Sequence, residues 1–466
     1  MTRADRPGGD RATVRRHTPR GSAQQPLRPV DPARLVAYDL LRAVASEGAY
    51  ANLLLPRLLT ERGLDTRDRA FATELGYGTL RALGTLDALL DRHVSGPLQP
   101  AVRDALRLGA YQLWRTRVPP RAAVTTTVDL VRSIEPRASR LANAVLRRVA
   151  DDIAAGDLGG PDPATDPVGA LALQHAHPRW IVEAYADALG SAPASTTATG
   201  QDELRAALEA DDARPQVHLV ARRMPRDALL AAAGAGAGPG RWSDRAVYLG
   251  GGDPGEVAAV RDGRAAVQDE GSQLVALALA AADAPGTLTI DLTSGPGGKG
   301  ALLSAAGLEV VGLELHPPRA RLVRRSGVPV AVADARHPPL LPGSADRVLL
   351  DAPCSGLGAL RRRPEARWRR TAADVAPLAV LQAQLLAAAV ELLRPGGVVA
   401  YVTCSPHRAE TVDVVAAELA RGLVDPVDAR PLLPGGMPQL GDGPSVQLWP
   451  HRHGTDAMFL AVLRRR

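Results

Sequence analysis

The stretch Thr287–Gly300, TLTIDLTSGPGGKG, decides the fold. Its first six residues form a short β-rich run, and the run leads directly into the glycine-rich segment SGPGGKG (294–300). A Walker A loop would need Gly at position 293 and Ser or Thr at position 300, and the dinucleotide pattern G-x-G-x-x-G is also poorly matched. Glycines without a Cβ let a ligand approach the backbone closely. The stretch therefore predicts a strand, a tight ligand-binding turn and a helix.

Four further β-rich runs follow, each ending in polar, Gly or Pro residues: EVVGLEL (309–315), PVAVADA (329–335), DRVLLDAP (346–353) and GVVAYVTCS (397–405). Helical segments lie between several of them, most clearly at 376–397. This alternation is typical of a parallel, doubly wound, Rossmann-like α/β sheet. Ligands bind beyond the carboxyl ends of the strands in such sheets. We therefore expect the site at the residues that follow each run.

The whole chain has 466 residues, which predicts several domains. We expect a multidomain protein with the following parts: a disordered basic tail over 1–30, an all-α domain over 31–155, a linker over 156–168, a small α+β RNA-binding subdomain over 169–262, and the Rossmann-like domain over 263–466. Helical spacing of Leu35, Tyr38, Leu41 and Val44 begins the all-α part.

Charge and composition point to a nucleic-acid partner in the cytoplasm. The net charge is +6 and nearly all the positive charge is arginine, whose guanidinium binds phosphate with two parallel hydrogen bonds. The N-terminus lacks an apolar signal-peptide core, and apolar runs such as Leu274–Ala282 are too short to cross a bilayer. We expect a cytoplasmic monomer without a membrane partner.

Both cysteines of the chain, Cys354 and Cys404, occur as Cys-Ser at the carboxyl ends of predicted strands, in DAPCSG (351–356) and TCS (403–405). A lone cysteine is usually a small buried hydrophobe. Here, however, both cysteines of the chain follow strands at the edge of the sheet where ligands bind, which favours a catalytic role for them. A zinc site with His407 lacks a fourth ligand, so no metal is expected. A disulfide is disfavoured in a reducing compartment.

These motifs, downstream of PGGK (296–299), resemble the RNA cytosine-5 methyltransferases of the Sun/Fmu family. The helical front end resembles a NusB-like RNA-binding domain through the segments RDRAFATELGYGTLR (67–81), LRLGAYQL (106–113) and NAVLRR (143–148). The resemblance covers roughly 31–466. It implies S-adenosylmethionine-dependent methylation of C5 of a cytosine in small-subunit (16S) rRNA, through a covalent bond between a cysteine and C6.

The resemblance also implies the site residues. Cys404 is the nucleophile, Asp351 assists at N3 and Cys354 helps product release; without the family the two cysteines could not be ordered, since DNA cytosine methyltransferases use the Pro-Cys one. The residues implied around S-adenosylmethionine are Thr293, Ser294, Gly295, Pro296, Gly297, Gly298, Lys299, Glu314, Arg319, Asp334 and Asp351. Glu314 stands where family members usually carry Asp, and either carboxylate can bind a ribose diol.

Lys299 is the single lysine of the chain. In the strand order usual for methyltransferases, the first strand lies beside the fourth and the fifth lies beyond the fourth. The turn that holds Lys299 should therefore open onto the cavity of Asp351, Cys354 and Cys404. A slender ammonium fits between cofactor and base where a guanidinium fork would not, so we assign Lys299 to the catalytic group.

The segment LRRRPEARWRR (360–370) carries six arginines around Trp368. A charge run is usually a solvated face, but beside a site for a flipped-out base it would bind RNA phosphates. We therefore predict RNA contacts for Arg361, Arg362, Arg363, Arg367 and Trp368. Two rival interpretations stay open: a non-catalytic RNA-binding or antitermination factor, and a tRNA cytosine-5 methyltransferase with the same mechanism.

Overall fold

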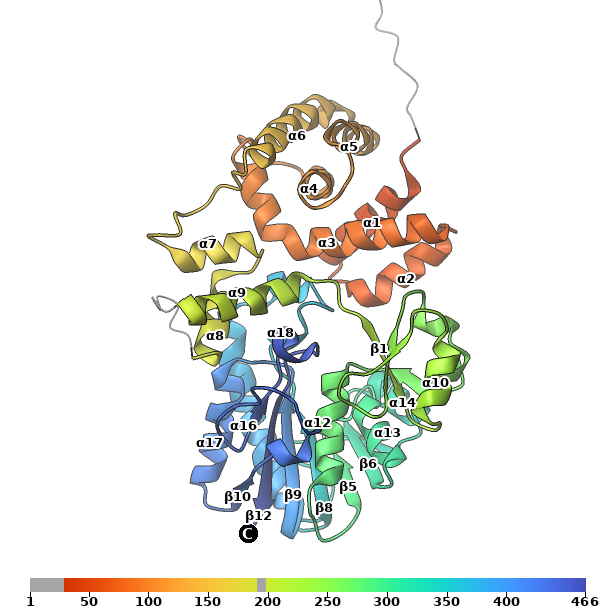
Figure 1. Cartoon of the computed structure of the whole chain (residues 1–466), viewed down its shortest axis with the longest axis vertical. Coiled ribbons are helices and arrows are strands. Elements are labelled where there is room, and N and C mark those ends of the chain that lie inside the picture. The colour runs from red at the N-terminus through yellow and green to blue at the C-terminus, as the bar shows by residue number, and fades with distance from the viewer. Residues whose placement is uncertain (1–28, 191–197) are drawn as a thin grey trace, which may run out of the picture.

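The computed structural model describes residues 29–190 and 198–466. The predicted basic tail (1–30) lies outside the described residues except for its last two positions. The described chain has an all-helical part at one end and a large sheet at the other, with α9 (Ala198–Asp212) and β1 (Val217–Ala221) running between them (Figure 1).

The all-helical part contains six α-helices: α1 (Pro32–Ser46), α2 (Ala51–Glu61), α3 (Thr66–Asp91), α4 (Pro100–Arg115), α5 (Pro120–Ile134) and α6 (Ser139–Ala154). Asp31 caps α1 by accepting a hydrogen bond from the Arg34 backbone N–H at 3.0 Å. The core is built of Leu, Val and Ala. Gly78 lets α3 and α4 approach closely, because a Cβ there would lie 2.0 Å from the Tyr111 hydroxyl.

The middle part begins with α7 (Pro167–Gln174) and α8 (Arg179–Ala188). After α9, an antiparallel sheet with the order β2-β3-β1-β4 forms from β1, β2 (Gly238–Pro239), β3 (Ala246–Leu249) and β4 (Ala265–Val267), with α10 (Arg226–Ala233) and α11 (Ala258–Arg261) beside it. β4 pairs with β1 although it lies beyond residue 262, and α7 begins inside the predicted linker. The division into domains stays a prediction.

The large sheet has the order β10-β12-β9-β8-β5-β6-β7, with β11 paired to β12. Its strands are β5 (Leu288–Asp291), β6 (Glu309–Glu314), β7 (Val330–Val332), β8 (Ala345–Asp351), β9 (Leu393–Thr403), β10 (Val424–Val427), β11 (Val446–Gln447) and β12 (Phe459–Arg465). The five predicted strands are all present and run parallel. β5 lies beside β8 and β9 lies beyond β8, as predicted. β12 and β10 add an antiparallel edge.

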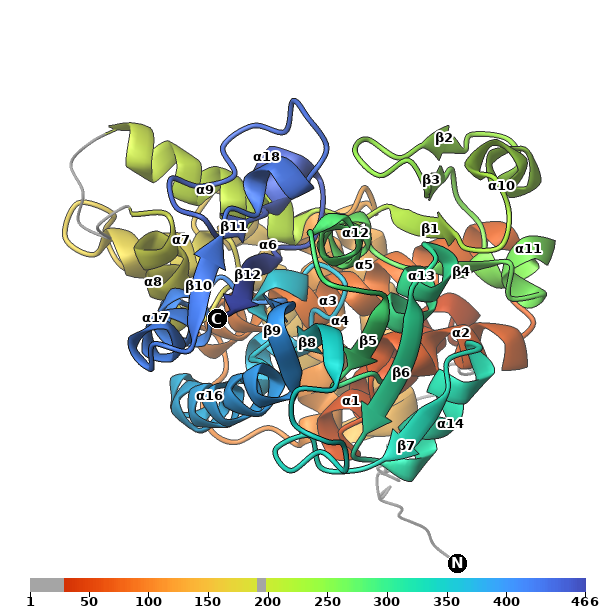
Figure 2. The same ribbon diagram turned by 90° about the horizontal axis from the view of Figure 1, so that it is seen from below.

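Helices cover both faces of this sheet (Figure 2). One face packs on α12 (Glu270–Ala281), α13 (Gly298–Ala305) and α14 (Pro317–Arg325), and the other packs on α16 (Val375–Leu392) and α17 (Val412–Ala420). α18 (Pro450–His453) lies near the C-terminus. Because helices cover both faces, the residues of the central strands β8 and β9 are almost all buried. The predicted fold class, a NusB-like helical part before a Rossmann-like sheet, is confirmed.

One segment, Ala372–Leu392, is long and apolar enough to cross a membrane by length and composition. The expectation that no segment reaches this length is therefore wrong. The segment contains α16, and its side chains Leu385, Leu386 and Val390 are buried against the strands of the large sheet. Its apolar length thus belongs to the core of a doubly wound sheet.

Candidate functional site

The turn after β5 is shaped by its glycines. A Cβ on Gly295 would lie 2.1 Å from the Glu314 carboxylate, so only glycine allows the turn to pass over the end of β6. Gly297 has a φ of +100°, and α13 begins directly after it. The residues from Thr293 to Lys299 thus wrap closely over the carboxyl ends of β5 and β6, as the sequence predicts for a ligand-binding turn.

Two predicted cofactor residues on β6 and α14 are tied to this turn. Glu314 accepts hydrogen bonds from the backbone N–H of Gly295 at 3.1 Å and of His316 at 2.9 Å. Arg319 donates to the Gly295 carbonyl at 2.6 Å. Asp334 lies beyond β7 and pairs with Arg336 at 2.6 Å, and this hydrogen bond lowers the pKa of Asp334 to about 2. A carboxylate therefore lies at the end of β6 and another lies just beyond the end of β7.

Asp291, at the end of β5, is fully enclosed. Burial raises the pKa of Asp291 to about 7, partly opposed by a hydrogen bond from the Ser294 hydroxyl at 3.0 Å. Its Oδ1 atom has no hydrogen-bond partner within the described part of the chain. This orphan oxygen, the close glycine turn and the Glu314 carboxylate fit a ligand that carries positive charge and a ribose diol, as S-adenosylmethionine does.

The single lysine meets Asp351 across neighbouring strands. Lys299 Nζ lies 2.6 Å from Asp351 Oδ2, with side-chain exposures of 13% and 31%. Burial opposes the charge, but the Asp351 carboxylate raises the pKa of Lys299, and the charge of Cys404 contributes to this rise. Lys299, Asp351 and Cys404 are therefore electrostatically coupled.

The two thiols are free and face each other, with Cys354 Sγ and Cys404 Sγ 3.4 Å apart. The hydrogen bond from Cys354 lowers the pKa of Cys404, and the Lys299 and Arg363 charges act in the same direction. The same hydrogen bond, together with burial, raises the pKa of Cys354 well above its ordinary value. The opposite directions of the two pKa shifts favour Cys404 as the thiolate of the pair, which the positions of the cysteines in the sequence could not decide.

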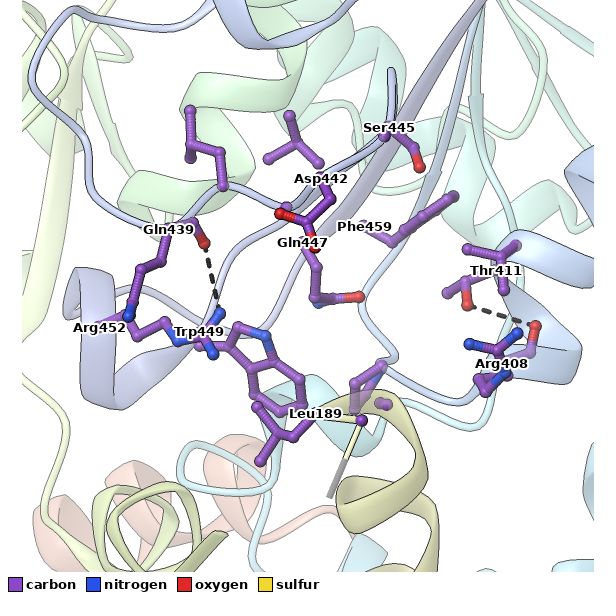
Figure 3. Close-up of a pocket in the computed structure, with 18 of the residues that line it drawn as sticks. Leu189, Arg408, Thr411, Gln439, Asp442, Ser445, Gln447, Trp449, Arg452 and Phe459 are labelled. Carbon is purple, nitrogen blue, oxygen red and sulfur yellow. Dashed lines mark hydrogen bonds between the residues drawn. The ribbon is translucent and has the colours of Figure 1, made fainter. Parts of the chain in front are cut away.

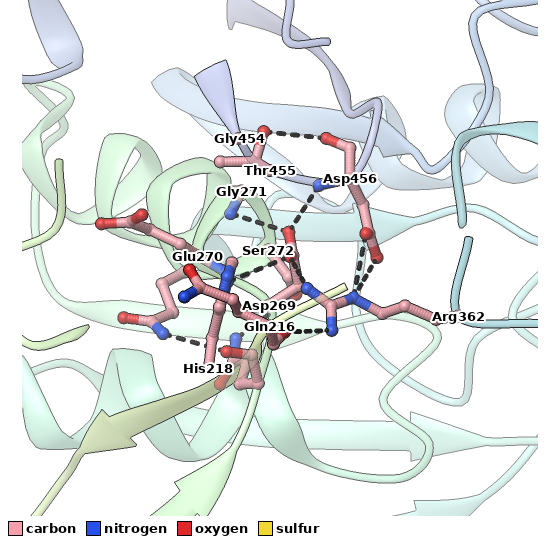
Figure 4. A network of polar contacts seen from close by, with 12 residues as sticks. Gln216, His218, Asp269, Glu270, Gly271, Ser272, Arg362, Gly454, Thr455 and Asp456 are labelled. Carbon is pink, nitrogen blue, oxygen red and sulfur yellow. Dashed lines mark hydrogen bonds and ion pairs between the residues drawn. The ribbon is translucent and has the colours of Figure 1, made fainter. Parts of the chain in front are cut away.

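The arginine-rich segment contradicts the predicted RNA contacts at its buried positions. Arg361 and Arg362 form ion pairs with both Asp269 and Asp456 in a buried network that also reaches His218 on β1 (Figure 4). Arg361 is 8% exposed. These two guanidiniums join the start of α12, the C-terminal segment and the middle sheet. The predicted RNA contact is corrected for the buried Arg361, whereas for Arg362, whose side chain is 23% exposed, it stays a prediction.

Arg367 bonds to the middle part of the chain, and Trp368 bonds to α3 of the helical part. Arg367 is fully buried and pairs with Asp212 at 2.8 Å while donating to backbone carbonyls of His175, Ala176 and Asp211. Trp368 donates from its ring N–H to the Leu80 carbonyl at 2.9 Å. A buried guanidinium bonded within the protein is not available to phosphate, so the RNA prediction is wrong for Arg367 and is not supported for Trp368.

Arg363 differs from the other four, because its side chain is exposed. Its charge also reaches Cys404, where it helps to lower the pKa. Of the five residues predicted to bind RNA, Arg363 alone combines exposure with closeness to the nucleophile among the described positions. Its role in RNA binding stays a prediction.

Sequence reasoning missed the buried carboxylate of Glu410, which contacts both Cys-Ser turns. The available signal was that a serine follows each cysteine. A separate cavity of about 560 Å³, lined by Leu189, Arg408, Asp442, Trp449 and others, lies between α8, α17 and the C-terminal loop (Figure 3). It contains none of the predicted site residues. No group of three or more His, Cys, Asp or Glu that could hold a metal occurs in the described ranges.

Comparison with known families finds relatives of both the helical part and the large sheet. The profile of the family described as 16S rRNA methyltransferase RsmB/F matches residues 276–464, and that of the NusB family matches residues 31–151. The crystal structure of PH0851 has a TM-score of 0.76 over 94% of this chain and 100% of its own, at 20% identity. The structure of NSun6 from Pyrococcus horikoshii with SFG has a TM-score of 0.51 over 62% of this chain and 98% of its own, at 18% identity.

Similar sequences extend over most of the chain. A protein of Mycobacterium tuberculosis (strain H37Rv), named as a methyltransferase without a stated substrate, is 53% identical over 96% of this chain and 99% of its own length. The ribosomal RNA small subunit methyltransferase B of Pseudomonas putida is 35% identical over 83% of this chain and 89% of its own length. The chain therefore belongs to the RsmB/F family of 16S rRNA methyltransferases, which use S-adenosylmethionine as methyl donor.

Proposed function

We propose that the protein methylates C5 of a cytosine in 16S rRNA through a covalent bond between Cys404 and C6. The observation that carries this proposal is the pair of free thiols 3.4 Å apart, coupled to the Lys299–Asp351 ion pair at the carboxyl ends of β8 and β9. In methylation of an amino or hydroxyl group the substrate atom attacks the methyl group itself, so such an enzyme would need no cysteine nucleophile.

The chemistry explains why such a cysteine is needed. C5 of cytosine is a poor nucleophile. When the Cys404 thiolate adds to C6, an S–C6 bond forms and the electron pair of the C5–C6 double bond shifts through C4 to N3, which takes up a proton. The Lys299–Asp351 pair holds a proton beside the thiolate and is the source we assign. S-adenosylmethionine, when bound, supplies an electrophilic methyl group to the enamine carbon C5.

Release reverses these shifts. The proton on C5 leaves to water, its bonding electrons restore the C5–C6 double bond, and the S–C6 bond breaks with its electron pair returning to Cys404. The proton on N3 returns to the Lys299–Asp351 pair. The Cys354 thiol, whose Sγ lies 3.4 Å from that of Cys404, donates a hydrogen bond to the departing thiolate and stabilises it. The net change is one methyl group gained by C5 and one proton released.

The cofactor residues follow from the turn and the strand ends. We assign Thr293 to Gly298 and the enclosed Asp291 to the methionine part, and Glu314, with its lone pairs at the end of β6, to the ribose diol. Arg319 holds the Gly295 carbonyl and so fixes the turn. Asp334 is assigned to the adenine side. The 16S rRNA substrate places the reaction in the cytoplasm.

The test uses labelled S-adenosylmethionine and small-subunit RNA from a strain that lacks the gene. We expect 5-methylcytosine at one position of 16S rRNA, no transfer with Cys404→Ala, and a trapped protein–RNA adduct on a denaturing gel with Cys354→Ala. Full activity of Cys404→Ala would overturn the nucleophile assignment. Methylation of tRNA alone would favour the tRNA enzyme, and absence of S-adenosylmethionine binding in calorimetry would favour a non-catalytic RNA-binding factor. Bisulfite sequencing of RNA from the deletion strain identifies the nucleotide.

A further inference from the structure

We propose that Glu410 is a positioning residue, which clamps the two Cys-Ser turns together so that Cys354 stays in register with Cys404. The inference rests on the proposed function, since it assigns the release step to a geometry that Glu410 maintains. Glu410 ends the short 3-10 helix Arg408–Glu410 that follows the Cys404 turn, and its side chain is fully buried.

The carboxylate of Glu410 accepts hydrogen bonds from four donors. Oε1 accepts from the Ser355 backbone N–H at 2.7 Å and from Gln382 Nε2 at 3.2 Å. Oε2 accepts from the hydroxyls of Ser355 and Ser405, the latter at 2.7 Å. Four donors match the acceptor capacity of an ionised carboxylate. Because Ser355 follows Cys354 and Ser405 follows Cys404, one side chain fixes both turns.

Further bonds make this clamp rigid. Gln382, on α16, also donates to the Pro353 carbonyl at 2.9 Å, directly before Cys354. Tyr401 donates from its hydroxyl to the Glu410 carbonyl at 2.7 Å. The clamp is thus anchored to α16, a helix that packs on the large sheet, and to β9, a strand of that sheet. Side chains held in this way can keep a catalytic pair within the few tenths of an ångström that its chemistry needs.

A carboxylate costs free energy to bury, and an apolar side chain could fill the same volume without that cost. The buried Glu410 therefore does more than fill space. Glu410 has no lysine or arginine within ion-pair distance in the described part of the chain, so its charge is balanced by hydrogen bonds alone. The pKa of Cys354 is raised chiefly by its hydrogen bond to Cys404 and by burial, and the Glu410 charge adds to this rise. Glu410 is not among the causes of the Cys404 shift.

These contacts predict which step fails without the carboxylate. In Glu410→Gln one carboxylate oxygen becomes an amide nitrogen, which cannot accept a hydrogen bond. The serine hydroxyls that donate to Oε2 must then reverse their hydrogen bonds, and the link between the two turns weakens. Cys404 keeps its neighbours Lys299 and Arg363 and can still attack C6. Cys354 no longer stays at its position beside Cys404, and release of the methylated RNA from Cys404 slows. We expect kcat to fall by about 10²-fold, an unchanged Kd for S-adenosylmethionine, and accumulation of the methylated protein–RNA adduct that Cys354→Ala also produces.

Glu418→Gln is the matched control. Glu418 is a buried glutamate (4% exposed) on α17, the helix that follows Glu410, and its hydrogen bond goes to Arg421 and not to a cysteine turn. A merely structural role for Glu410 predicts that both variants lose melting temperature and activity together, with no adduct. That outcome, or wild-type turnover in Glu410→Gln, overturns the proposal.

If Glu410→Gln does not fold, Ser405→Ala decides, because it removes one arm of the clamp and leaves the carboxylate in place. Adduct accumulation in Ser405→Ala supports the proposal, and wild-type turnover overturns it. Wild-type protein and Cys404→Ala are run beside these variants. A wild type that forms no 5-methylcytosine contradicts the proposed function, whereas a normal wild type with an adduct-free, fully active Glu410→Gln contradicts the clamp alone.

Discussion

Lys299 and Asp351 lie 52 positions apart in the chain, yet their charged atoms are 2.6 Å apart. The contact exists because β5 and β8 are parallel neighbours, so that the turn after one strand and the end of the next meet at the same edge of the sheet. The thiol pair lies at the end of β8 and of its other neighbour, β9. The ends of three adjacent strands, β5, β8 and β9, therefore bring together the four residues of the proposed catalytic group.

Lys299→Arg should impair methyl transfer, although it preserves charge. The guanidinium fork needs more room than the ammonium beside Asp351 and Cys404, so we expect kcat to fall by at least about tenfold. Single-turnover methylation measures this. Arg62→Lys, which swaps the same residue types in an exposed pair with Asp39, is the control and should behave as wild type. Normal kinetics in Lys299→Arg would mean that the lysine has no special role.

Alkylation of the two cysteines should differ with pH. Cys404 has a lowered pKa because Cys354 donates a hydrogen bond to it, so its reaction with iodoacetamide should begin at lower pH than that of an ordinary thiol. In Cys354→Ala this inflection moves to higher pH, because the donor is lost. Cys354→Ser keeps a donor and should move it less. Mass spectrometry of the two cysteine peptides gives both curves, and identical curves for all variants would exclude the hydrogen bond as the cause.

Arg367→Met and Arg363→Ala should separate stability from RNA binding. Removing the buried Arg367 leaves Asp212 and three carbonyls without their donor, so we expect a loss on the order of 3 kcal/mol in unfolding free energy. Arg363→Ala should leave the melting temperature unchanged, weaken binding to 16S rRNA and reduce the salt dependence of binding by about one ion. If Arg367→Met instead weakened RNA binding without a loss of stability, and Arg363→Ala lowered stability alone, the original prediction that Arg367 binds RNA would hold.

The pH dependence of stability should report Asp291. Burial raises the pKa of Asp291 to about 7 in the folded state, above its ordinary value. Between about pH 4 and pH 7 the folded state therefore binds the extra proton, and stability falls as the pH rises through this interval, by at most about 1.4 kcal/mol per pH unit. Asp291→Asn should flatten the plot of melting temperature against pH. The control Asp227→Asn, at an exposed position, should leave that plot unchanged. Parallel curves for wild type and Asp291→Asn would contradict this assignment.

Much of this site could be predicted because its geometry depends on strand order. Each β-rich run ended in a polar or glycine residue, and the parallel arrangement alone brings Lys299, Asp351 and the cysteines together. The family and the cofactor, expected from DAPCSG, TCS and PGGK, are confirmed. The family resemblance implied the roles of the two thiols, which stay a proposal. Their contact at 3.4 Å is one that no spacing in the sequence expresses.

The arginine-rich segment was misinterpreted for a related reason. Six guanidiniums in eleven residues suggest a surface, but the acids that neutralise them are far along the chain: Asp269 is 93 positions from Arg362, and Asp212 is 155 positions from Arg367. Glu410 was missed because its partners are serines, which are too common to stand out. Long-range pairing of this kind becomes visible only when the fold is known.

The contact of Trp368 with α3 limits how enzymes of this kind can be recombined. A Cβ at position 84 would lie 2.3 Å from the indole ring, so the helical front end carries a glycine notch shaped for a side chain of the catalytic part. Glu365 also accepts a hydrogen bond from the Ala51 backbone at 3.3 Å. A chimera that exchanges the front end must keep that notch, and a chain truncated before α7 exposes the indole and should aggregate.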